Sequence, residues 1–383
     1  MRPKILIIGM IDSIHLSRWL NQFVNCEIDF YIFTSKKYRK IHKEIKSLIN
    51  SEHNASYTHI QKIKTNILQG YFDFLRNEIL GKFLPKFTRT AFLTKILIKQ
   101  NFKYIHAVEI QSAGYLLNSV NPDLLKNSNV IITNWGSDIY YFKQFSEHTT
   151  KIKSVLSKAN FYSAECKRDY KLAEEFGFSG KFLPCIPNAG GFDIDFFQKN
   201  FTNPSKRNQI LIKGYGGIFG QAAIVIPLIP EIITRFPQVQ FHFYSVTEDV
   251  MIIINKLSVE IQNQIRVSSV GKRLSHKDML IEFSKSRIHI GCSKSDGIST
   301  AFLESLICGA YPVQTNTSCA DEWMDRGARA SIVNLDSNEI LSHVLYALKD
   351  DQLVDKAAEI NYSVAKKYLD YGVVQKQALE FYK

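Results

Sequence analysis

The feature that most constrains the fold of this chain is a regular alternation of short β-branched runs with amphipathic stretches of helical period. Strand-like runs in the first half are Ile5–Gly9, Ile28–Phe33, Tyr104–Val108, Val130–Asn134 and Phe161–Ala164. Helix-like stretches, such as Ser13–Phe23 and Lys153–Lys158, lie between them. Strands that alternate with helices form βαβ units, and these units build parallel sheets. The sequence therefore predicts an α/β fold.

A second series of the same kind follows residue 200. The stretch from Pro184 to Pro204 is rich in turn formers and polar residues, which is typical of a link between domains. The later strands are expected at Ile210–Lys213, Gln240–Tyr244, Arg266–Ser268, Ile288–Cys292 and Tyr311–Gln314, and the helices at Gln221–Thr234, His276–Ser284 and Thr300–Cys308. Because 383 residues exceed one ordinary core, we expect two domains, residues 1–200 and 201–368. Parallel sheets bind ligands at the carboxyl ends of their strands, so we expect a cleft there.

Composition narrows the class of protein. The chain is 45% hydrophobic and 22% charged, which is the balance of a folded globular protein. No apolar run reaches the roughly 18 residues that a spanning helix needs, and the first one stops at Asp12, too early for a signal peptide. The six cysteines form no CxxC pair and have no histidine at metal-ligand spacing, so we expect buried, unpaired thiols. These features predict a cytoplasmic protein.

The net charge of +12 is concentrated in the first quarter of the chain. Residues 1–100 hold 17 basic and 7 acidic residues, whereas the remainder holds 31 and 29. The densest basic run is 36–40. Such asymmetry is typical of a helix face that is exposed to solvent. It is also typical of a surface that binds an anionic partner, either a membrane leaflet or a nucleic acid. No nucleic-acid recognition module is visible in the sequence.

The most informative segment is Ile288–Val313, which is expected as strand, polar loop, helix and strand. Ser299 or Thr300 suits the N-cap of the helix, and a helix N-terminus favours an anion such as phosphate. Asp296 and Glu304 are eight positions apart, and carboxylates accept hydrogen bonds from sugar and ribose hydroxyls. The alternative is a capping aspartate and a solvated helical glutamate.

This segment resembles the E-x7-E region of retaining glycosyltransferases of the family 4 type, which have the GT-B fold of two Rossmann-like domains facing across a cleft. The resemblance implies that Glu304 holds the nucleotide ribose. It implies that Asp296, in place of the usual glutamate, lies beside the donor sugar. Gly297, Ser299 and Thr300 complete the donor-binding loop and helix start.

Other segments extend the resemblance over nearly the whole chain. Ile210–Gly220 is similar to the family's first donor-domain strand and glycine loop, where a basic residue meets the diphosphate; here that residue is Lys213, or else Lys213 is a solvated strand-end lysine. Phe219 stands where many relatives have a second basic residue. Lys272 and Arg273, in a later loop that lies against the nucleobase in the family, are therefore candidates for the second phosphate contact.

In the N-terminal half, Ile131–Asp138 resembles the family's "HGSD" loop, with Trp135 in place of the histidine. An indole can stack on a sugar but cannot act as an acid or base. Asp138 of this loop, Glu109 after the preceding strand, and Ser13 and His15 after the first strand are the expected acceptor or cleft residues. The alternative for His15 is a structural role in the capping region of the helix. Residues 369–383 are expected to cross back onto the first domain.

The resemblance implies retaining transfer of a hexosyl group from a UDP- or GDP-sugar to a glycan or lipid-linked acceptor, as in bacterial O-antigen or capsule synthesis. Lys213 and Asp296 are the expected catalytic residues: Asp296 positions the sugar, and Lys213 with the helix start stabilises the departing diphosphate. No DxD-type pair stands out, so we expect no metal and no cofactor besides the donor.

The resemblance and the charge pattern also predict where the protein acts in the cell, and two alternative functions remain open. Residues 1–100 are expected to allow peripheral contact with the cytoplasmic face of the inner membrane, and no nucleic acid is expected as a partner. The alternatives are a sugar-nucleotide epimerase of the same fold and a basic nucleic-acid-binding protein. A nicotinamide-dependent oxidoreductase is excluded, because the loop from Gly9 to Asp12 lacks the G-x-G-x-x-G pattern.

Overall fold

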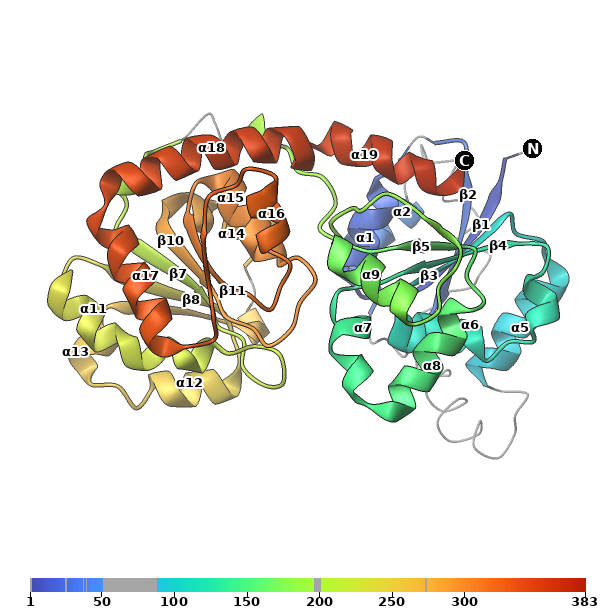
Figure 1. The fold of residues 1–383 in the computed structure, drawn as a ribbon, viewed down its shortest axis with the longest axis horizontal. Helices are drawn as coiled ribbons and strands as arrows, with labels where there is room; N and C mark the ends of the chain where they lie inside the picture. The colour runs from blue at the N-terminus through green and yellow to red at the C-terminus, as the bar shows by residue number, and fades with distance from the viewer. Residues whose placement is uncertain are drawn as a thin grey trace. The chain divides into compact units, whose positions relative to one another are not determined.

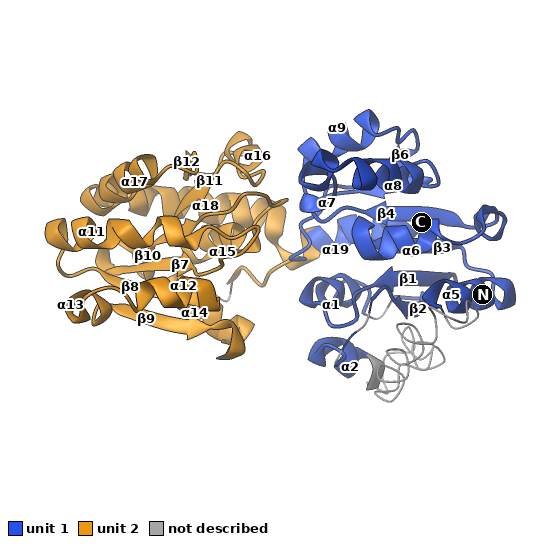
Figure 2. Cartoon of the chain, turned by 90° about the horizontal axis from the view of Figure 1, so that it is seen from below, with its two compact units in different colours: residues 1–190, 374–383 blue, residues 191–373 orange. Residues whose placement is uncertain are grey.

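The chain forms two compact units, which are described separately. The structure is a computed structural model, and it describes residues 2–24, 26–36, 38, 40–50, 88–195, 201–272 and 274–383. Unit 1 comprises residues 1–190 and 374–383, and unit 2 comprises residues 191–373 (Figure 2). The sequence places this boundary near residue 200 and the return to the first domain at residue 369. The chain re-enters unit 1 at Val374.

Unit 1 is built on a parallel six-stranded sheet in the order β2-β1-β3-β4-β5-β6. Its strands are β1 (Lys4–Gly9), β2 (Asp29–Thr34), β3 (Tyr104–Val108), β4 (Asn129–Thr133), β5 (Phe161–Ser163) and β6 (Lys181–Phe182). The four strands β1, β3, β4 and β5 lie at the centre, are almost entirely buried and are mainly apolar. Parallel strands covered on both faces are expected to be apolar throughout, so the sequence pattern and the topology agree.

Helices connect the strands of unit 1 (Figure 1). They are α1 (Ile14–Asn21), α2 (Lys43–Asn50), α5 (Arg89–Lys99), α6 (Tyr115–Asn118), α7 (Ser137–Tyr140), α8 (Ser146–Leu156) and α9 (Lys167–Glu175), with a π-helical turn η4 (Ile110–Gly114) before α6. Side chains cap α1 and α5, since Ser13 accepts from the backbone N–H of His15 and Thr88 accepts from that of Ala91. Such caps satisfy backbone donors that the first helical turn leaves free.

The core of unit 1 has two layers, one on each face of the sheet. Leu6 and Ile8 of β1 pack into one layer, and Ile5 and Ile7 pack into the other. The second layer also contains side chains from the last residues of the chain, where α19 (Tyr371–Leu379) contributes Val374 and Ala378 and the following turn contributes Phe381 and Tyr382. Unit 1 is therefore completed by residues from the far end of the sequence.

Unit 2 is built on a second parallel six-stranded sheet, in the order β12-β11-β10-β7-β8-β9. Its strands are β7 (Gln209–Lys213), β8 (Gln240–Val246), β9 (Ile265–Ser269), β10 (Ser286–Gly291), β11 (Tyr311–Thr315) and β12 (Ser331–Val333). Counted within the unit, this order is 3-2-1-4-5-6 from β9 to β12, the order of the doubly wound nucleotide-binding fold.

Helices flank this sheet on both sides (Figure 1). They are α11 (Ile229–Arg235), α12 (Glu248–Ile254), α13 (Val259–Gln262), α14 (His276–Lys285), α15 (Thr300–Cys308), α16 (Asp321–Asp325), α17 (Ser337–Lys349) and α18 (Asp351–Leu369). The helix expected over Gln221–Thr234 is replaced by two 3-10 turns and the short α11. Pro227 and Pro230 explain the difference, because each lacks a backbone N–H and resists an unbroken helix.

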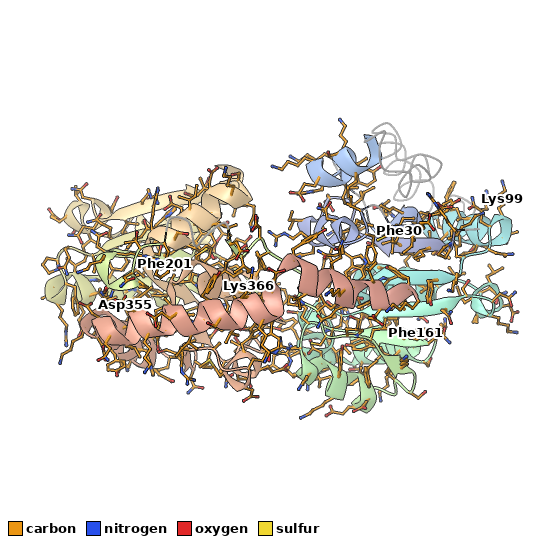
Figure 3. The ribbon with its side chains drawn as sticks, turned by 90° about the horizontal axis from the view of Figure 1, so that it is seen from above. Phe30, Lys99, Phe161, Phe201, Asp355 and Lys366 are labelled. Atoms are coloured by element: carbon orange, nitrogen blue, oxygen red, sulfur yellow. The ribbon has the colours of Figure 1, made fainter. Side chains whose placement is uncertain are left out.

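The long helix α18 is tied to the rest of unit 2 by polar side chains along its length. Asp355, labelled on α18 in Figure 3, accepts hydrogen bonds from the backbone N–H and the hydroxyl of Ser205. Lys366, further along the same helix, pairs with Asp195 at 2.8 Å. These contacts hold α18 against unit 2 up to the point where the chain continues into α19.

Each sheet has a topological switch point, where the strands on one side are added in the opposite direction to those on the other side. In unit 1 this point lies between β1 and β3, and in unit 2 it lies between β7 and β10. Doubly wound sheets bind ligands in the crevice beyond the carboxyl ends of the strands at this position. Ligand sites are therefore expected at the carboxyl ends of β1, β3, β7 and β10.

Candidate functional site

A pocket opens in unit 2 at the carboxyl ends of β7 and β10. Three of the residues predicted for the donor site line it, namely Lys213, Asp296 and Ser299. Tyr215, Phe219, Gly220, Gly291 and Gln314 are among its other lining residues. The Lys213 ammonium lies 5.0 Å from the centre of the Tyr215 ring. The fold thus brings together a cation, a carboxylate and a helix start that are far apart in the sequence.

The glycine-rich loop after β7 forms one wall of this pocket and is fixed by the start of α12. The backbone N–H of Gly216 donates to Thr247 Oγ1 at 2.9 Å, and that of Gly217 donates to Asp249 Oδ2 at 3.0 Å. Gly217 has φ +71°, and a β-carbon at Gly216 would overlap the Asp249 carboxylate. The backbone conformation therefore favours glycine at Gly217, and at Gly216 a β-carbon would displace the Asp249 carboxylate that holds the loop.

The loop between β10 and α15 forms the opposite wall. Asp296 accepts a hydrogen bond from the backbone N–H of Gly297 at 2.9 Å, and its own backbone N–H donates to the carbonyl of Thr317. Ser299 is the N-cap residue of α15, and its side chain makes no capping bond to the helix. Thr300 is the first helical residue. The first N–H groups of α15 consequently lie at the edge of the pocket that holds Lys213, where an anion is favoured.

Glu304 lies one turn further along α15 and is almost fully buried. Its Oε1 is 2.7 Å from Nε2 of His276, the first residue of α14. Glu304 is not among the residues that line the pocket of Lys213. The side chain of His276 is 40% exposed and that of Glu304 is 9% exposed, so the pair is open to solvent mainly on the side of the histidine.

The remaining predicted donor residues are placed as follows. Gly297 and Thr300 belong to the wall and the helix start just described, without lining the pocket themselves. Lys272 ends a 3-10 turn after β9, and its side chain lies outside the described residues, as does the whole of Arg273. Their predicted phosphate contact stays a prediction.

A separate pocket lies in unit 1 near the ends of β3, β4 and β5. His15 and Trp135, both predicted acceptor residues, line it together with His106, Thr133 and Asn188. The His15 and Trp135 rings meet edge to face at 5.2 Å, and His15 Nδ1 lies 3.4 Å from the carbonyl oxygen of Asn188. The indole face and the imidazole therefore form one wall of polar and aromatic groups that suits a sugar ring.

The other predicted residues of unit 1 support this pocket without lining it. Asp138 is buried and accepts from the backbone N–H groups of Trp135 at 3.0 Å and Ile110 at 2.8 Å. Burial and then the neighbouring Glu109 carboxylate raise the pKa of Asp138 above its ordinary value. Asp138 thus fixes the backbone that carries Trp135.

Glu109 and Ser13 also act on the backbone. Glu109 has φ +79°, which is rare for a residue other than glycine, and its carboxylate accepts from the N–H groups of Ser112 and Ala113. These bonds stabilise the strained conformation at the exit of β3. Ser13 caps α1 and thereby sets the position of His15. The three residues are structural neighbours of the pocket.

Two residues at the donor side were not singled out from the sequence. His276 begins a helix that the sequence predicts, but nothing in its sequence surroundings points to Glu304, which is 28 positions away. Gln314 lines the pocket of Lys213 and is only 2% exposed. Its position did carry a signal, since a glutamine ends the otherwise apolar run Tyr311–Val313 in a strand expected to be buried.

Comparison with known proteins supplies the context for both pockets. Residues 4–166 match the family described as Glycosyl transferase 4-like, a match that covers most of unit 1. No curated protein matches the chain in sequence. The match shows that the first unit is similar to glycosyltransferases, and it favours neither a nucleic-acid-binding protein nor an epimerase.

Solved structures extend the similarity to both units. HepE from Anabaena, solved in complex with UDP-glucose, is 14% identical with a TM-score of 0.68, over 99% of this chain and 98% of that one. Sucrose-phosphate synthase from Thermosynechococcus elongatus is 14% identical with a TM-score of 0.68, over 100% and 98%. TarM from S. aureus, in complex with fondaparinux, α-GlcNAc-glycerol and UDP, is 13% identical with a TM-score of 0.61, over 77% and 59%. The chain has the fold of these GT-B proteins.

Proposed function

We propose that this glycosyltransferase, of the family 4 type and with the GT-B fold, moves a hexosyl group from a UDP-sugar to a glycan or lipid-linked acceptor with retention of anomeric configuration. Unit 2 binds the donor, and the pocket of His15 and Trp135 in unit 1 binds the acceptor or the sugar that is transferred. The observation that carries the proposal is the convergence of Lys213, Asp296 and the start of α15 on one pocket.

The residues of this pocket match the parts of a nucleotide-sugar. The Lys213 ammonium and the first N–H groups of α15 suit a diphosphate. Asp296 offers carboxylate oxygens to sugar hydroxyls, and Glu304 offers them to the hydroxyls of the ribose. In this role the carboxylate of Glu304 either exchanges His276 for the ribose or binds both, since each of its oxygens can accept more than one hydrogen bond.

Chemistry in this site consists mainly of stabilising the leaving group. The bond between the anomeric carbon and the phosphate oxygen breaks, and the negative charge develops on the diphosphate beside Lys213 and α15. The acceptor oxygen forms the new bond to the same carbon, and its proton passes to an oxygen of the departing diphosphate. Asp296 is proposed to orient the sugar. Because no DxD-type pair stands out at a strand end in the sequence, we propose that the reaction needs no metal.

Two of the compared proteins motivate the choice of donor and acceptor. HepE is described in complex with UDP-glucose, and TarM with UDP and α-GlcNAc-glycerol. On this basis we propose UDP as the nucleotide, with GDP as the second choice. We also propose a role in bacterial surface polysaccharide synthesis, such as O-antigen or capsule, at the cytoplasmic face of the inner membrane.

Thermal unfolding across a panel of nucleotides tests the donor assignment. The protein, in EDTA, is heated with UDP-, GDP-, dTDP- and CMP-sugars in turn. A ligand that binds the folded state raises the melting temperature by mass action, and at 100 times its Kd the stabilisation is about 2.7 kcal/mol. We expect a selective rise with UDP-sugars that Lys213→Ala and Glu304→Ala each abolish.

Matched variants separate the site from general effects of charge. Lys256→Ala and Glu260→Ala remove the same side-chain types from exposed positions of unit 2 and should leave the rise intact. A melting temperature that no nucleotide changes at millimolar concentration would contradict the assignment of the donor site. The anomeric configuration of the product, read by NMR, tests retention, and inversion would refute it.

A further inference from the structure

Gln314 has a carboxamide whose oxygen is buried and unpaired. The side chain lies near the end of β11 and lines the pocket of Lys213 and Asp296, with a residue exposure of only 2%. Among the described residues, none donates a hydrogen bond to its Oε1. A buried acceptor without a donor is costly, and such groups are concentrated where a ligand or an ordered water completes the bond.

The sheet register explains how this carboxamide reaches the pocket. Gly291 on β10 pairs with Gln314 on β11, and Ile290 pairs with Ile212 on β7, so Lys213 is level with Gly291. Residues level with one another in a parallel sheet point to the same face. The last row of the sheet therefore presents a cation, a position without a side chain, and a carboxamide.

Gly291 provides the space that the carboxamide occupies. A β-carbon built on Gly291 would overlap Gln314 Oε1 and lie 3.0 Å from its Cδ. Gly291 has no positive φ that would require glycine for its backbone, so the space is the reason for glycine here. The pair Gly291–Gln314 thus forms a built feature of the pocket floor.

The chemistry of the unpaired atom identifies what it recognises. Oε1 is an acceptor, so its partner must carry a hydrogen, as a sugar hydroxyl does and a deprotonated phosphate does not. Lys213 in the same row suits the phosphate, and Asp296 in the same pocket suits sugar hydroxyls. The carboxamide lines the same pocket as both groups, so a sugar hydroxyl close to the diphosphate is the donor that fits it.

We infer that Gln314 is a specificity-determining residue, which accepts a hydrogen bond from one hydroxyl group of the donor's sugar. The inference rests on the proposed function of unit 2 as the donor-binding unit. It adds a contact that distinguishes the sugar from the nucleotide, because UDP alone carries no sugar hydroxyl at this position.

Calorimetric titration of the full chain with UDP and with UDP-glucose, UDP-galactose and UDP-N-acetylglucosamine tests the inference. Gln314→Met keeps the side-chain length and removes the acceptor. We expect it to weaken the tightest UDP-sugar about tenfold, as for the loss of a buried hydrogen bond, and to change the affinity for UDP less than about twofold. Deoxy analogues of that UDP-sugar should identify one hydroxyl whose removal weakens wild type but not Gln314→Met.

Two further variants make the result decisive. Gly291→Ala displaces the carboxamide without altering Gln314, so it should reproduce the selective loss, and it carries the test if Gln314→Met does not fold. Gln264→Met is the matched control, because Gln264 in the same unit also has a buried, unpaired Oε1 but does not line the pocket. Its titrations should equal those of wild type.

The possible outcomes distinguish a failure of the proposed function from a failure of the inference about Gln314. Wild-type protein that binds no nucleotide contradicts the proposed function, and the inference with it. Wild-type protein that binds UDP-sugars with an affinity that Gln314→Met and Gly291→Ala leave unchanged contradicts the inference alone. An equal loss of affinity for UDP and UDP-sugar also contradicts it, since the carboxamide would then contact the diphosphate.

Discussion

The buried histidines His106 in unit 1 and His289 in unit 2 are kept neutral by their surroundings. Burial lowers the pKa of His106 to about 3, and burial together with the nearby Lys213 lowers the pKa of His289 to about 3. His106 Nε2 lies 2.6 Å from Thr133 Oγ1, and its Nδ1 lies 2.7 Å from the Tyr382 hydroxyl. Both histidines have lower pKa values in the native state than the usual ~6.5 of an unfolded chain.

This difference predicts an acid-sensitive fold. Between pH 3 and 6.5 the unfolded chain binds protons that the native chain does not, so stability is full above pH 6.5 and is lost as the pH falls below it. At pH 5 each histidine should cost about 2 kcal/mol relative to neutral pH. Denaturant unfolding at pH 7 and pH 5 measures the effect, and His106→Gln should reduce the pH dependence while lowering stability at pH 7.

His148→Gln serves as the control for this prediction. His148 is half-buried on α8, where its Nδ1 contacts the Tyr115 hydroxyl at 2.8 Å. This variant should retain the pH dependence of wild type. An unchanged pH dependence in His106→Gln would show that the buried imidazole is not responsible for the acid sensitivity.

Single residues also mark where sequence reasoning succeeds and fails. Asp296, Ser299 and Lys213 could be predicted to share a pocket, because each stands at a strand or helix end and such ends meet in this fold. His276 could not be paired with Glu304, since the contact depends on how α14 packs beside α15. The unpaired oxygen of Gln314 is visible only once the register with Gly291 is known.

At the scale of elements, the sequence predicts positions well and interruptions less well. Strand β3 and helix α15 coincide residue for residue with the expected Tyr104–Val108 and Thr300–Cys308. The expected helix over Gln221–Thr234 was wrong, because the two prolines inside it allow 3-10 turns and only a short helix. Hydrophobic periodicity identifies elements, whereas backbone chemistry decides where they break.

The glycine loop after β7 provides a prediction at this scale. Gly216→Ala would push the loop away from Asp249 and from the start of α12, which moves the wall beside Lys213. We expect at least a tenfold loss of UDP-sugar affinity, of the size of one or two lost hydrogen bonds to a charged ligand, with a smaller change in melting temperature.

Gly372→Ala is the comparison for the glycine loop. A β-carbon there would be 3.5 Å from Asp370 Oδ1, an ordinary contact, so affinity and folding should both be retained. UDP-sugar titration of both variants measures the effect. Wild-type affinity in Gly216→Ala would mean that the loop does not form the donor wall.

For the whole molecule, the alternation of strands and helices predicts two parallel-sheet units, and the structure confirms this fold class. The order of strands could not be predicted, because it depends on which crossover packs best and not on local pattern. In unit 1 the first strand, β1, lies between the second and third strands, β2 and β3. In unit 2 the first strand, β7, lies between the second and fourth strands of that unit, β8 and β10. The basic bias of residues 1–100 is likewise visible in the sequence, but its purpose is a property of the assembled surface.

That surface carries the third prediction. Lys36, Lys40, Lys43 and Lys46 are exposed in unit 1, although Lys37 and Arg39 of the densest basic run lie outside the described residues. In the described part of the chain, no helix has the length and apolar character to cross a membrane. We expect binding to vesicles that contain phosphatidylglycerol and none to vesicles of phosphatidylcholine alone, with affinity falling as salt is added.

Charge reversal on α2 measures this contact. Lys43→Glu combined with Lys46→Glu should weaken vesicle binding roughly 30-fold or more, at about 1 kcal/mol for each lost lysine. Lys256→Glu with Lys349→Glu makes the same change of charge on exposed positions of unit 2 and should bind like wild type. Equal loss in both double variants would point to net charge alone instead of a defined membrane-facing surface.

The return of residues 374–383 to unit 1 constrains how the molecule can be made. On the ribosome, the strands of unit 1 emerge first, yet the segment that completes the core layer on one face of their sheet emerges only after the whole of unit 2. At about 5–20 residues per second, translating the 183 residues of unit 2 takes about 10 to 40 s. Unit 2 is therefore the first that can finish folding, while in the nascent unit 1 the apolar residues that contact Val374, Ala378, Phe381 and Tyr382 in the finished fold remain exposed.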